Sequence, residues 1–544
     1  MPGSIDPFGL RLVIEMAPPE VPKEIQGPSP PIKEEPSKAT REPAKQAPPG
    51  PQEPEPCPAS DSADSDMGFF FWTKVLVASE WAIRLIMLPV IVLRKEKPTT
   101  CLAWLTVVFF EPWVGLGLYL LIGENRLGRR QLARRQQLRP LLEASEYPHV
   151  ESAHVIDPAE TDEYNVLIHL AEHGGGLPVV AGNSISLMSD TDAAIDRLIE
   201  AIDSARHHVH LLFYIFKNDA VGYRVAKALV LAAARGVVCR VLADAVGSRQ
   251  LFRGLAPWLQ RHGVRVFPVL PANLWRIPFS RLDLRNHRKL AVIDGTVAFT
   301  GSQNIVEASY GHKRAGVWHD VMARITGPVV RQLQRIFLED WFYASGELVE
   351  DAALFPVCQP DGPIAIQVIP TGPDQPTELF QDLVVRAIFL ARRRVVITSP
   401  YFIPNEAMLL ALRLAALRGV QVDLVIPKRC DHRVVNAAGA FYCDYLMRFG
   451  VRVFLFQEGM LHAKTLTIDD ELAMFGSANY DIRSFSLNFE LNLFMHSAEA
   501  VEAMHALQQG YLDKSLQAVP DKWPPQTLEN RLKMNLAKLF SPLL

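Results

Sequence analysis

The pattern of hydrophobic and polar positions divides this 544-residue chain into regions of different character. Residues 1–66 are polar and rich in proline, glutamate, lysine and serine, with too few apolar side chains to form a core. We expect them to form a disordered tail. Residues 67–124 are strongly apolar, and residues 125–180 form a basic linker. Helical and strand patterns then alternate to the end of the chain.

The apolar region contains two long segments, Phe69–Leu93 and Leu102–Ile122. Each is close to the roughly 20 residues that a bilayer-spanning helix needs. Polar residues interrupt both: Glu80 lies four residues before Arg84, where the two can pair, and Glu111-Pro112 can break the second helix. The pattern predicts a membrane-associated helical hairpin rather than a soluble one. Two full spans and a hairpin that dips in and returns both remain open.

A basic run follows this hairpin directly. By the positive-inside tendency, its position places this end of the hairpin on the cytoplasmic side. The run is also suited to anionic lipid headgroups, although a solvated helix face would have a similar composition. More than sixty polar residues precede the hairpin, which argues against a signal peptide. The run consists of Arg126, Arg129, Arg130, Arg134, Arg135 and Arg139.

Beyond about residue 180, helical stretches lead into short apolar strands. The predicted strands include Val209–Phe216, Val237–Leu242 and Gly263–Phe267, and their nearly continuous apolar character is typical of buried strands. This alternation predicts an α/β fold with a largely parallel sheet covered by helices on both faces.

The same order of elements recurs later in the chain. Arg393–Ile403 resembles the first of these strands, and Gly450-Val-Arg-Val-Phe454 repeats Gly263-Val-Arg-Val-Phe267. We infer an internal duplication with two homologous lobes, residues 181–350 and 351–544, that share one cleft.

A paired motif carries the chemistry. His287-Arg-Lys-Leu-Ala-Val-Ile-Asp294 is matched 175 residues later by His462-Ala-Lys-Thr-Leu-Thr-Ile-Asp469. Residues two apart in a strand point the same way, so each histidine should share a pocket with the lysine two residues on. A glycine-serine turn with an asparagine follows each copy, in Gly301-Ser-Gln-Asn304 and Gly476-Ser-Ala-Asn479.

These residue types suit cleavage and transfer of a phosphodiester. The lysines Lys289 and Lys464 can neutralise the nonbridging oxygens, and we expect the turn residues Ser302, Asn304, Ser477 and Asn479 to bind substrate. One imidazole can attack phosphorus to give a phosphohistidine, while the other acts as general acid and base. Six cysteines show neither a Cys-x-x-Cys spacing nor a cluster with histidines, so we expect no metal and no cofactor.

Four acidic residues complete the candidate site. Asp320 and Glu490 follow the two turns and are expected to hold the histidines in one tautomer. Asp294 and Asp469 end the two motifs and join the catalytic set by their place in them. A structural role for these two aspartates at a turn is the favoured alternative.

The two HxKxxxxD motifs with downstream GSxN turns resemble the phospholipase D superfamily. The apolar hairpin, Asp481–Glu490 and the terminal Ser541-Pro-Leu-Leu544 look like bacterial cardiolipin synthases of the phospholipase D type. The resemblance implies transfer of a phosphatidyl group from one phosphatidylglycerol to a second, with release of glycerol and formation of cardiolipin. It also implies His287 as nucleophile and His462 as acid and base, although sequence alone does not separate these roles. Arg288, between the first histidine and lysine, should point away from the pocket.

Location and alternatives follow from the same features. The resemblance and the basic run imply a bacterial cytoplasmic (inner) membrane protein with its lobes facing the cytoplasm. The formal net charge of -3 does not favour binding of nucleic acid. A lipid hydrolase and a non-catalytic membrane scaffold remain alternatives, and the oligomeric state, possible homodimer included, is open. An amphipathic segment from Leu528 to Phe540 is expected either to lie on the membrane or to close the second lobe.

Overall fold

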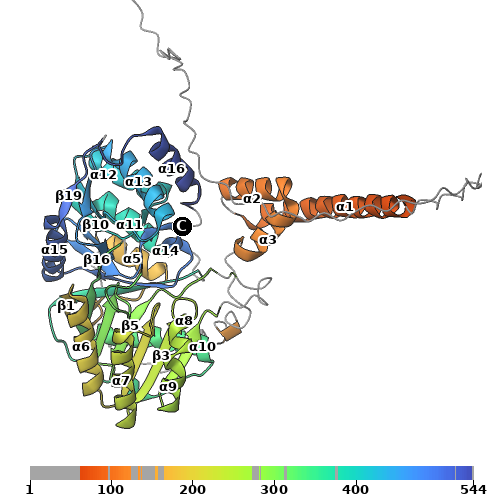
Figure 1. Ribbon diagram of the computed structural model, residues 1–544. Coiled ribbons are helices and arrows are strands. Elements are labelled where there is room, and N and C mark those ends of the chain that lie inside the picture. Colours follow the sequence, from red (N-terminus) through yellow and green to blue (C-terminus); the bar gives the residue numbers. More distant parts are fainter. Residues whose placement is uncertain are drawn as a thin grey trace, which may run out of the picture. The chain divides into compact units, whose positions relative to one another are not determined.

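A computed structural model shows the arrangement of the chain (Figure 1). It describes residues 62–95, 98–123, 133–134, 137, 154–156, 164–271, 281, 283–311, 315–373, 378–520 and 522–541. Nearly all of the predicted tail and most of the predicted linker lie outside the described residues. Of the basic run, only Arg134 is described, and of the terminal Ser541-Pro-Leu-Leu544 only Ser541.

Three helices form the apolar region: α1 (Ser62–Arg94), α2 (Pro98–Phe110) and α3 (Pro112–Ile122). The predicted break falls at Glu111, because Pro112 is the first residue of α3 and cannot continue α2. Helix α3 turns back so closely on α2 that a Cβ atom on Gly115 would lie 2.6 Å from the Cα of Val108. Among the described residues, only Phe70–Arg94, 25 residues long, is long and apolar enough to cross a bilayer.

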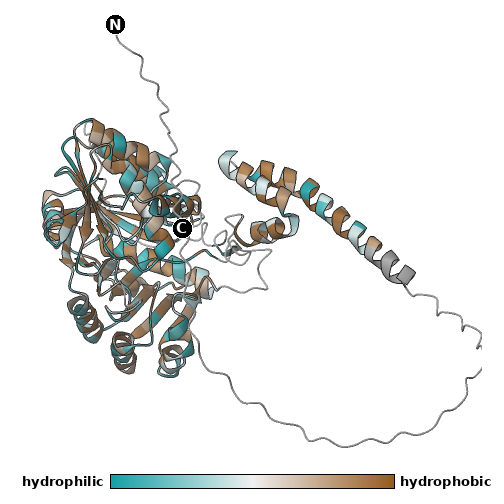
Figure 2. Cartoon of the chain, turned by 45° about the horizontal axis from the view of Figure 1, so that its top comes forward, coloured by the Kyte–Doolittle hydropathy of each residue, from teal (hydrophilic) through white to brown (hydrophobic). Residues whose placement is uncertain are grey.

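Two charged residues in the middle of α1 have partners within this region. Arg84 forms an ion pair with Glu80 at 3.3 Å, and its Nε donates to the carbonyl of Phe109, at the end of α2, at 2.9 Å. Large apolar side chains nevertheless remain exposed on all three helices, among them Leu85, Phe110 and Trp113. Figure 2 shows the hydrophobic colouring along much of these helices. An exposed apolar surface of this extent indicates membrane association.

The two lobes share one sheet of fifteen strands. Its order is β19-β13-β12-β10-β15-β16-β18-β9-β1-β8-β6-β5-β2-β3-β4. The first lobe contributes β1 (Val180–Met188), β2 (His208–Phe213), β3 (Val238–Asp244), β4 (Arg265–Val269), β5 (Lys289–Ile293), β6 (Val297–Gly301) and β8 (Met322–Thr326). The second contributes β9 (Ile364–Thr371), β10 (Arg394–Thr398), β12 (Gln421–Pro427), β13 (Arg452–Phe456), β15 (Thr465–Ile468), β16 (Leu472–Gly476), β18 (Glu490–Met495) and β19 (Ser515–Gln517).

The strand order confirms the internal duplication. Apart from β19 at one edge, equivalent strands of the two lobes follow one another symmetrically outward from β9 and β1. These two strands pair antiparallel, with Val180 opposite Ile366 and Asn183 opposite Ile364. The backbone ladder therefore continues from one lobe into the other, with a register shift between Val180 and Asn183.

The expectation of a largely parallel sheet is wrong. Parallel pairing joins only β2 to β3, β3 to β4, β10 to β12 and β12 to β13 within this sheet. The motif strands β5 and β15 instead return through short turns into β6 and β16, and such turns can join only antiparallel neighbours. The sheet is mixed, and the chemistry lies on its antiparallel part.

Helices cover both faces of the sheet, as predicted (Figure 1). In the first lobe, Leu211 packs into the cluster that contains α7, whereas its neighbour Leu212 packs with Leu333 and Phe337 of α10. Adjacent strand residues point to opposite faces, so α7 and α10 lie on opposite sides. The helices of this lobe are α6 (Thr191–Ser204), α7 (Ala220–Ala234), α8 (Arg249–Arg253), α9 (Leu255–Arg261) and α10 (Val329–Ser345). Those of the second are α11 (Leu379–Leu390), α12 (Glu406–Leu417), α13 (Arg433–Met447), α14 (Ile482–Ser486) and α15 (Ala498–Asp513), and α5 (Asn165–His173) precedes the first lobe.

The C-terminal amphipathic segment forms α16 (Leu528–Leu539). Ala537 is buried in one cluster with Ala438 of α13, so this helix closes the second lobe. Its opposite face carries an exposed leucine stripe, with 84% of Leu528, 59% of Leu532 and 50% of Leu536 accessible. Contact of this stripe with a membrane stays a prediction.

Candidate active site

Residues of both lobes line one cleft of about 490 Å³. It lies where the parallel strands β2 and β10 end, since Tyr214 follows β2 and Tyr401 follows β10 closely in the chain. The carboxyl ends of parallel strands are the usual ligand-binding edge of such sheets. The lining includes both motif histidines, both motif asparagines and a ring of aromatic and charged side chains: Tyr214, Arg285, His287, Asn304, Tyr310, Trp318, Tyr401, Asp431, His432, His462, Asn479, Asp481, Arg483 and Asn488.

The two histidines stand in equivalent places. His287 comes just before β5, and its backbone N–H donates to the carbonyl of Phe489 at 2.8 Å. His462 comes just before β15, and its N–H donates in the same way to the carbonyl of His319 at 2.8 Å. Each histidine is therefore anchored to the chain of the opposite lobe.

The carboxylates that hold the imidazoles also come from the opposite lobe. The Nδ1 atom of His287 lies 2.9 Å from Oε2 of Glu490, and that of His462 lies 2.6 Å from Oδ1 of Asp320. A carboxylate accepts only, so Nδ1 of each ring carries the proton and Nε2 keeps its lone pair. The structure thus brings together the four residues expected to act as pairs. In each pair the histidine comes from one lobe and the carboxylate from the other, which the sequence did not indicate.

The turn serines bind these carboxylates rather than the cleft. Ser302 Oγ donates to Asp320 Oδ1 and Ser477 Oγ donates to Glu490 Oε2, each at 2.6 Å. Both serines are completely buried. The structure therefore places them behind the histidines, which corrects the expectation that they bind substrate. Ser484, which the sequence analysis missed, adds a further donor to Glu490 at 3.0 Å.

The motif lysines lie beneath the histidines. Lys289 Nζ donates to the carbonyl of His287 at 2.7 Å, and Lys464 Nζ donates to the carbonyl of His462 at 2.6 Å. Both side chains are almost fully buried. Burial lowers the pKa of Lys289 to about 7 and lowers the pKa of Lys464 well below its ordinary value, although Asp320 and Glu490 oppose the shift.

The same burial keeps the imidazoles neutral. It lowers the pKa of His287 and of His462 to about 4, and the carboxylates of Glu490 and Asp320 offset this only in part. Burial alone would raise the pKa of the two carboxyl groups, but the histidines, the lysines and the serines outweigh it and hold both below their usual range. At neutral pH the free site therefore holds two carboxylates and two neutral imidazoles.

These shifts predict a bell-shaped pH dependence of kcat, measured with lipid in excess so that a bound phosphate helps one imidazole to keep its proton. A histidine with a pKa of about 4 gains its free Nε2 lone pair as the pH rises through 4, so activity should increase there. Lys289, with a pKa of about 7, loses its charge as the pH rises through 7, so activity should fall. A pH series on the full chain in lipid micelles measures both limbs. Lys289→Arg keeps its charge, so an alkaline limb that did not move upward in this variant would contradict the assignment.

The two asparagines lie in the cleft, where they were predicted. Asn304 Oδ1 accepts from the backbone N–H of Ile215 at 3.0 Å, which fixes the orientation of its amide. Asn479 is 7% exposed, and its backbone N–H donates to Ser484 Oγ at 3.1 Å. Both side chains line the cleft, and their binding to a phosphate stays a prediction.

The motif aspartates lie at the opposite ends of the motif strands. Asp294 accepts from the backbone N–H groups of Arg206, His207 and His208 at 2.8 to 2.9 Å, at the start of β2. Asp469 accepts equally from three N–H groups at the start of β10, at 2.8 to 2.9 Å. Since a strand rises about 3.3 Å per residue, five residues separate Asp294 from Lys289 by roughly 16 Å.

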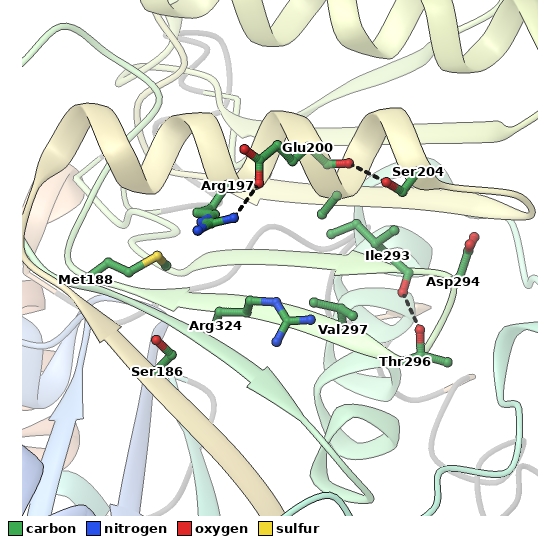
Figure 3. Close-up of a pocket in the computed structure, with 11 residues that line it drawn as sticks. Ser186, Met188, Arg197, Glu200, Ser204, Ile293, Asp294, Thr296, Val297 and Arg324 are labelled. Carbon is green, nitrogen blue, oxygen red and sulfur yellow. Dashed lines mark hydrogen bonds and ion pairs between the residues drawn. The ribbon is translucent and has the colours of Figure 1, made fainter.

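Asp294 borders a different cavity. This cavity, of about 550 Å³, lies between α6 and the sheet and also contains Arg197, Glu200 and Arg324 (Figure 3). Both motif aspartates adopt a positive φ of 50°, a turn conformation that aspartate tolerates better than most residues. We therefore remove Asp294 and Asp469 from the catalytic set and assign them the structural role that was the favoured alternative.

Arg288 points away from the cleft, as expected, and forms buried hydrogen bonds there. Its Nη1 pairs with Asp340 at 2.8 Å, its Nε donates to the carbonyl of Glu490 at 3.1 Å, and the side chain is 9% exposed. The second motif has the buried Ala463 at the equivalent position, so this buried link between lobes belongs to the first motif only.

Breaking this link should destabilise the fold. Arg288→Met leaves Asp340 charged and buried, which should cost about 3 to 5 kcal/mol in the free energy of unfolding. Denaturant titration of the detergent-solubilised full chain measures it. Arg393→Met is the matched control, because Arg393 pairs with Asp470 at the surface and should lose less than about 1 kcal/mol. Equal losses in the two variants would contradict the inference.

Sequence reasoning missed most of the cleft wall. The Tyr214 ring meets His287 edge-on at 4.9 Å, and the Trp318 ring meets His462 in the same way at 4.8 Å. Tyr214 and Tyr401 could have been found, because they occupy matching positions in the repeat. Arg285 carried no signal, and Arg483 lies in the segment Asp481–Glu490 that carried the resemblance but had no role assigned to it. Neither arginine has an equivalent in the other lobe.

The chain is similar to several known proteins. A family model described as cardiolipin synthase, PLD-like domain, matches residues 198–341 and 384–509. Cardiolipin synthase A of Yersinia pseudotuberculosis serotype O:1b (strain IP 31758) is 34% identical over 461 residues, covering 84% of this chain and 95% of the relative. Cardiolipin synthase A of Serratia proteamaculans (strain 568) matches with the same identity and coverage. The crystal structure of phosphatidylserine synthase from Haemophilus influenzae Rd KW20 shares the fold, with a TM-score of 0.53 and 14% identity over 70% of this chain and 100% of that one.

The duplicated fold and the paired motifs define an enzyme of the phospholipase D superfamily. Within it, the chain belongs to the cardiolipin synthase family, as the resemblance of its motifs implied. Membership places the protein in phospholipid synthesis, with lipids as substrates.

Proposed function

We propose that this protein is a membrane phosphatidyltransferase that makes cardiolipin from two phosphatidylglycerol molecules and releases glycerol. The observation that carries the proposal is the pair of imidazoles from separate lobes in one cleft. Each has Nδ1 bound to a buried carboxylate, which leaves Nε2 as the reactive nitrogen.

In the first step, Nε2 of His287 attacks the phosphorus of the donor lipid and forms a phosphohistidine. The bond from phosphorus to the glycerol oxygen breaks, and this oxygen takes a proton from Nε2 of His462. Binding of the anionic phosphate raises the pKa of His462, in the same direction as Asp320 already does, so that the ring can carry this proton. Glu490 stabilises the positive charge that develops on His287.

In the second step, the released glycerol gives way to the acceptor lipid. His462, now neutral, takes the proton from its terminal hydroxyl, and the oxygen attacks phosphorus. The bond to His287 Nε2 breaks, which restores both imidazoles and completes cardiolipin. Lys289, Lys464, Asn304 and Asn479 donate to the nonbridging oxygens through both steps.

For its location we propose the cytoplasmic (inner) membrane of a bacterium, with the lobes on the cytoplasmic side. The apolar helix from Phe70 to Arg94 supports attachment to the membrane. The arginine-rich sequence that follows the apolar region supports the cytoplasmic orientation, by the tendency of basic residues to stay inside.

Mass spectrometry of the products tests the proposal. The purified full chain is given phosphatidylglycerol as the sole lipid, then phosphatidylethanolamine alone, and then both together. We expect cardiolipin and glycerol in equal amounts from phosphatidylglycerol alone. Phosphatidic acid as the main product would instead identify a lipid hydrolase, and no turnover at all would favour a scaffold.

A further inference from the structure

One end of the cleft carries a cluster of positive charge that the two transfer steps above do not use. Arg285 and Arg483 both line the cleft. Arg483 Nη1 donates to Asp283 Oδ2 at 3.1 Å, and Arg281 Nη2 donates to the same oxygen at 2.9 Å. Asp283 thus pairs with two guanidinium groups, and Arg285 adds a third guanidinium to the cleft wall, whose lining also includes Asp481.

Arg285 is the arginine of this cluster that has no carboxylate partner among the described residues. Its Nη1 donates to the carbonyl of Leu284. It precedes His287 by two residues in an extended segment, so the two Cα atoms are roughly 7 Å apart. Both Arg285 and Arg483 also act electrostatically on Tyr214, whose ring touches His287. The cluster therefore lies beside the His287 end of the cleft.

Another part of the cleft wall carries an acidic side chain instead of arginines. Asp431 lines it there and accepts from the hydroxyl of Tyr401 at 2.8 Å. No arginine or lysine pairs with Asp431 among the described residues, where His432 is its one recorded ionic partner at 3.4 Å. A second anion in the cleft would be repelled by Asp431 and attracted by the arginines, so the cleft can orient a ligand that carries one.

The proposed reaction brings such an anion. The donor contributes the phosphate that reacts, which Lys289, Lys464 and the two asparagines can hold. The acceptor, if it is phosphatidylglycerol, contributes a phosphate that does not react, separated from the attacking hydroxyl by the three carbons of glycerol. This spacing of roughly 6 Å is short enough for one lipid to place its hydroxyl near His287 and its phosphate near Arg285. The guanidinium fork also fits two oxygens of a phosphate.

We propose that Arg285 and Arg483 bind the unreacting phosphate of the acceptor phospholipid and so favour an anionic lipid alcohol over water at the second step. This inference rests on the proposed function and names the determinant of its acceptor. It explains how the phosphatidyl group on His287 can pass to a lipid rather than to water. The arginines hold the acceptor by its phosphate while its hydroxyl reaches phosphorus.

Competition between acceptors tests the proposal. The full chain acts on phosphatidylglycerol micelles that contain ethanol, and mass spectrometry measures cardiolipin, phosphatidylethanol and phosphatidic acid together. All three products come from the same phosphohistidine, so their ratio reports only on the acceptor. In Arg285→Gln and Arg483→Gln, the ratio of cardiolipin to phosphatidylethanol should fall about tenfold to a hundredfold, the usual effect of losing one or two charge-assisted hydrogen bonds.

Two further variants and the outcomes complete the test. Arg285→Lys, which keeps the charge and loses the fork, should give an intermediate ratio, and Arg261→Gln, a surface arginine of α9, should leave it unchanged. An unchanged ratio in both glutamine variants overturns the proposal. A uniform loss of all three products with a constant ratio also overturns it. That result would show that the arginines bind the surface of the micelle or stabilise the fold instead. Absence of cardiolipin from the wild-type protein would contradict the proposed function itself.

Discussion

Replacement of either His287 or His462 by alanine should reduce cardiolipin formation by at least about a thousandfold. Each imidazole has a separate task, and removal of a nucleophile or of a general acid typically costs this much or more. Both rings line the cleft, and Ser302 and Ser477 still bind the carboxylates when a ring is removed, so both variants should stay folded. Product analysis by mass spectrometry, with circular dichroism to confirm folding, measures the effect.

A surface histidine provides the control. His262→Ala, in the first lobe, removes an exposed ring that contacts only the carbonyl of Trp258 by hydrogen bond among the described residues, and it should retain full activity. Near-normal transfer by either cleft variant would refute a mechanism that needs two imidazoles.

The same variants separate the two roles. A phosphatidyl ester with a good leaving group, such as nitrophenol, does not need an acid. His462→Ala should therefore still form a phosphohistidine from it, which labelled substrate reveals, whereas His287→Ala should not. The reverse result would exchange the assignments of nucleophile and acid.

The second large effect is expected from the carboxylates. Glu490→Gln and Asp320→Asn should each lower kcat by about a hundredfold to ten-thousandfold with little change in KM. A neutral amide holds the ring less firmly in the reactive tautomer and no longer stabilises the imidazolium that forms during transfer. Steady-state kinetics on detergent-solubilised protein measures kcat and KM separately.

Asp294→Asn is the matched comparison. It also replaces a carboxylate by an amide, but in an aspartate of the repeated motif that lies away from the histidines. Its carboxylate holds three backbone N–H groups at the start of β2, so we expect a loss of about 1 to 3 kcal/mol in stability and nearly normal kcat. An Asp294→Asn protein as stable as wild type and inactive would restore this aspartate to the catalytic set.

Much of the site could be predicted because it repeats. Two copies of one spacing identified the histidines, lysines and asparagines, and the apolar strands that recur in each half predicted two α/β lobes with a shared cleft. The proline after Glu111 located the break between α2 and α3, since proline cannot continue a helix.

The errors arose where partners are distant in sequence. Glu490 binds a histidine 203 residues away, and no spacing within one lobe shows such an exchange. The turn serines were expected to bind substrate, but their hydroxyl groups donate to the buried carboxylates. Strand direction was misjudged because a buried antiparallel strand is as apolar as a parallel one.

The pairing of β1 with β9 has a mechanical consequence. A clamshell motion would have to rupture that ladder, the smaller cross-lobe pairing of β7 (Trp318–His319) with β14 (Met460–Leu461) and the Arg288 contacts at once. The described contacts between the lobes therefore oppose an opening motion of this kind. A cleft of about 490 Å³ suits polar headgroups, so we expect lipid substrates to keep their acyl tails outside it.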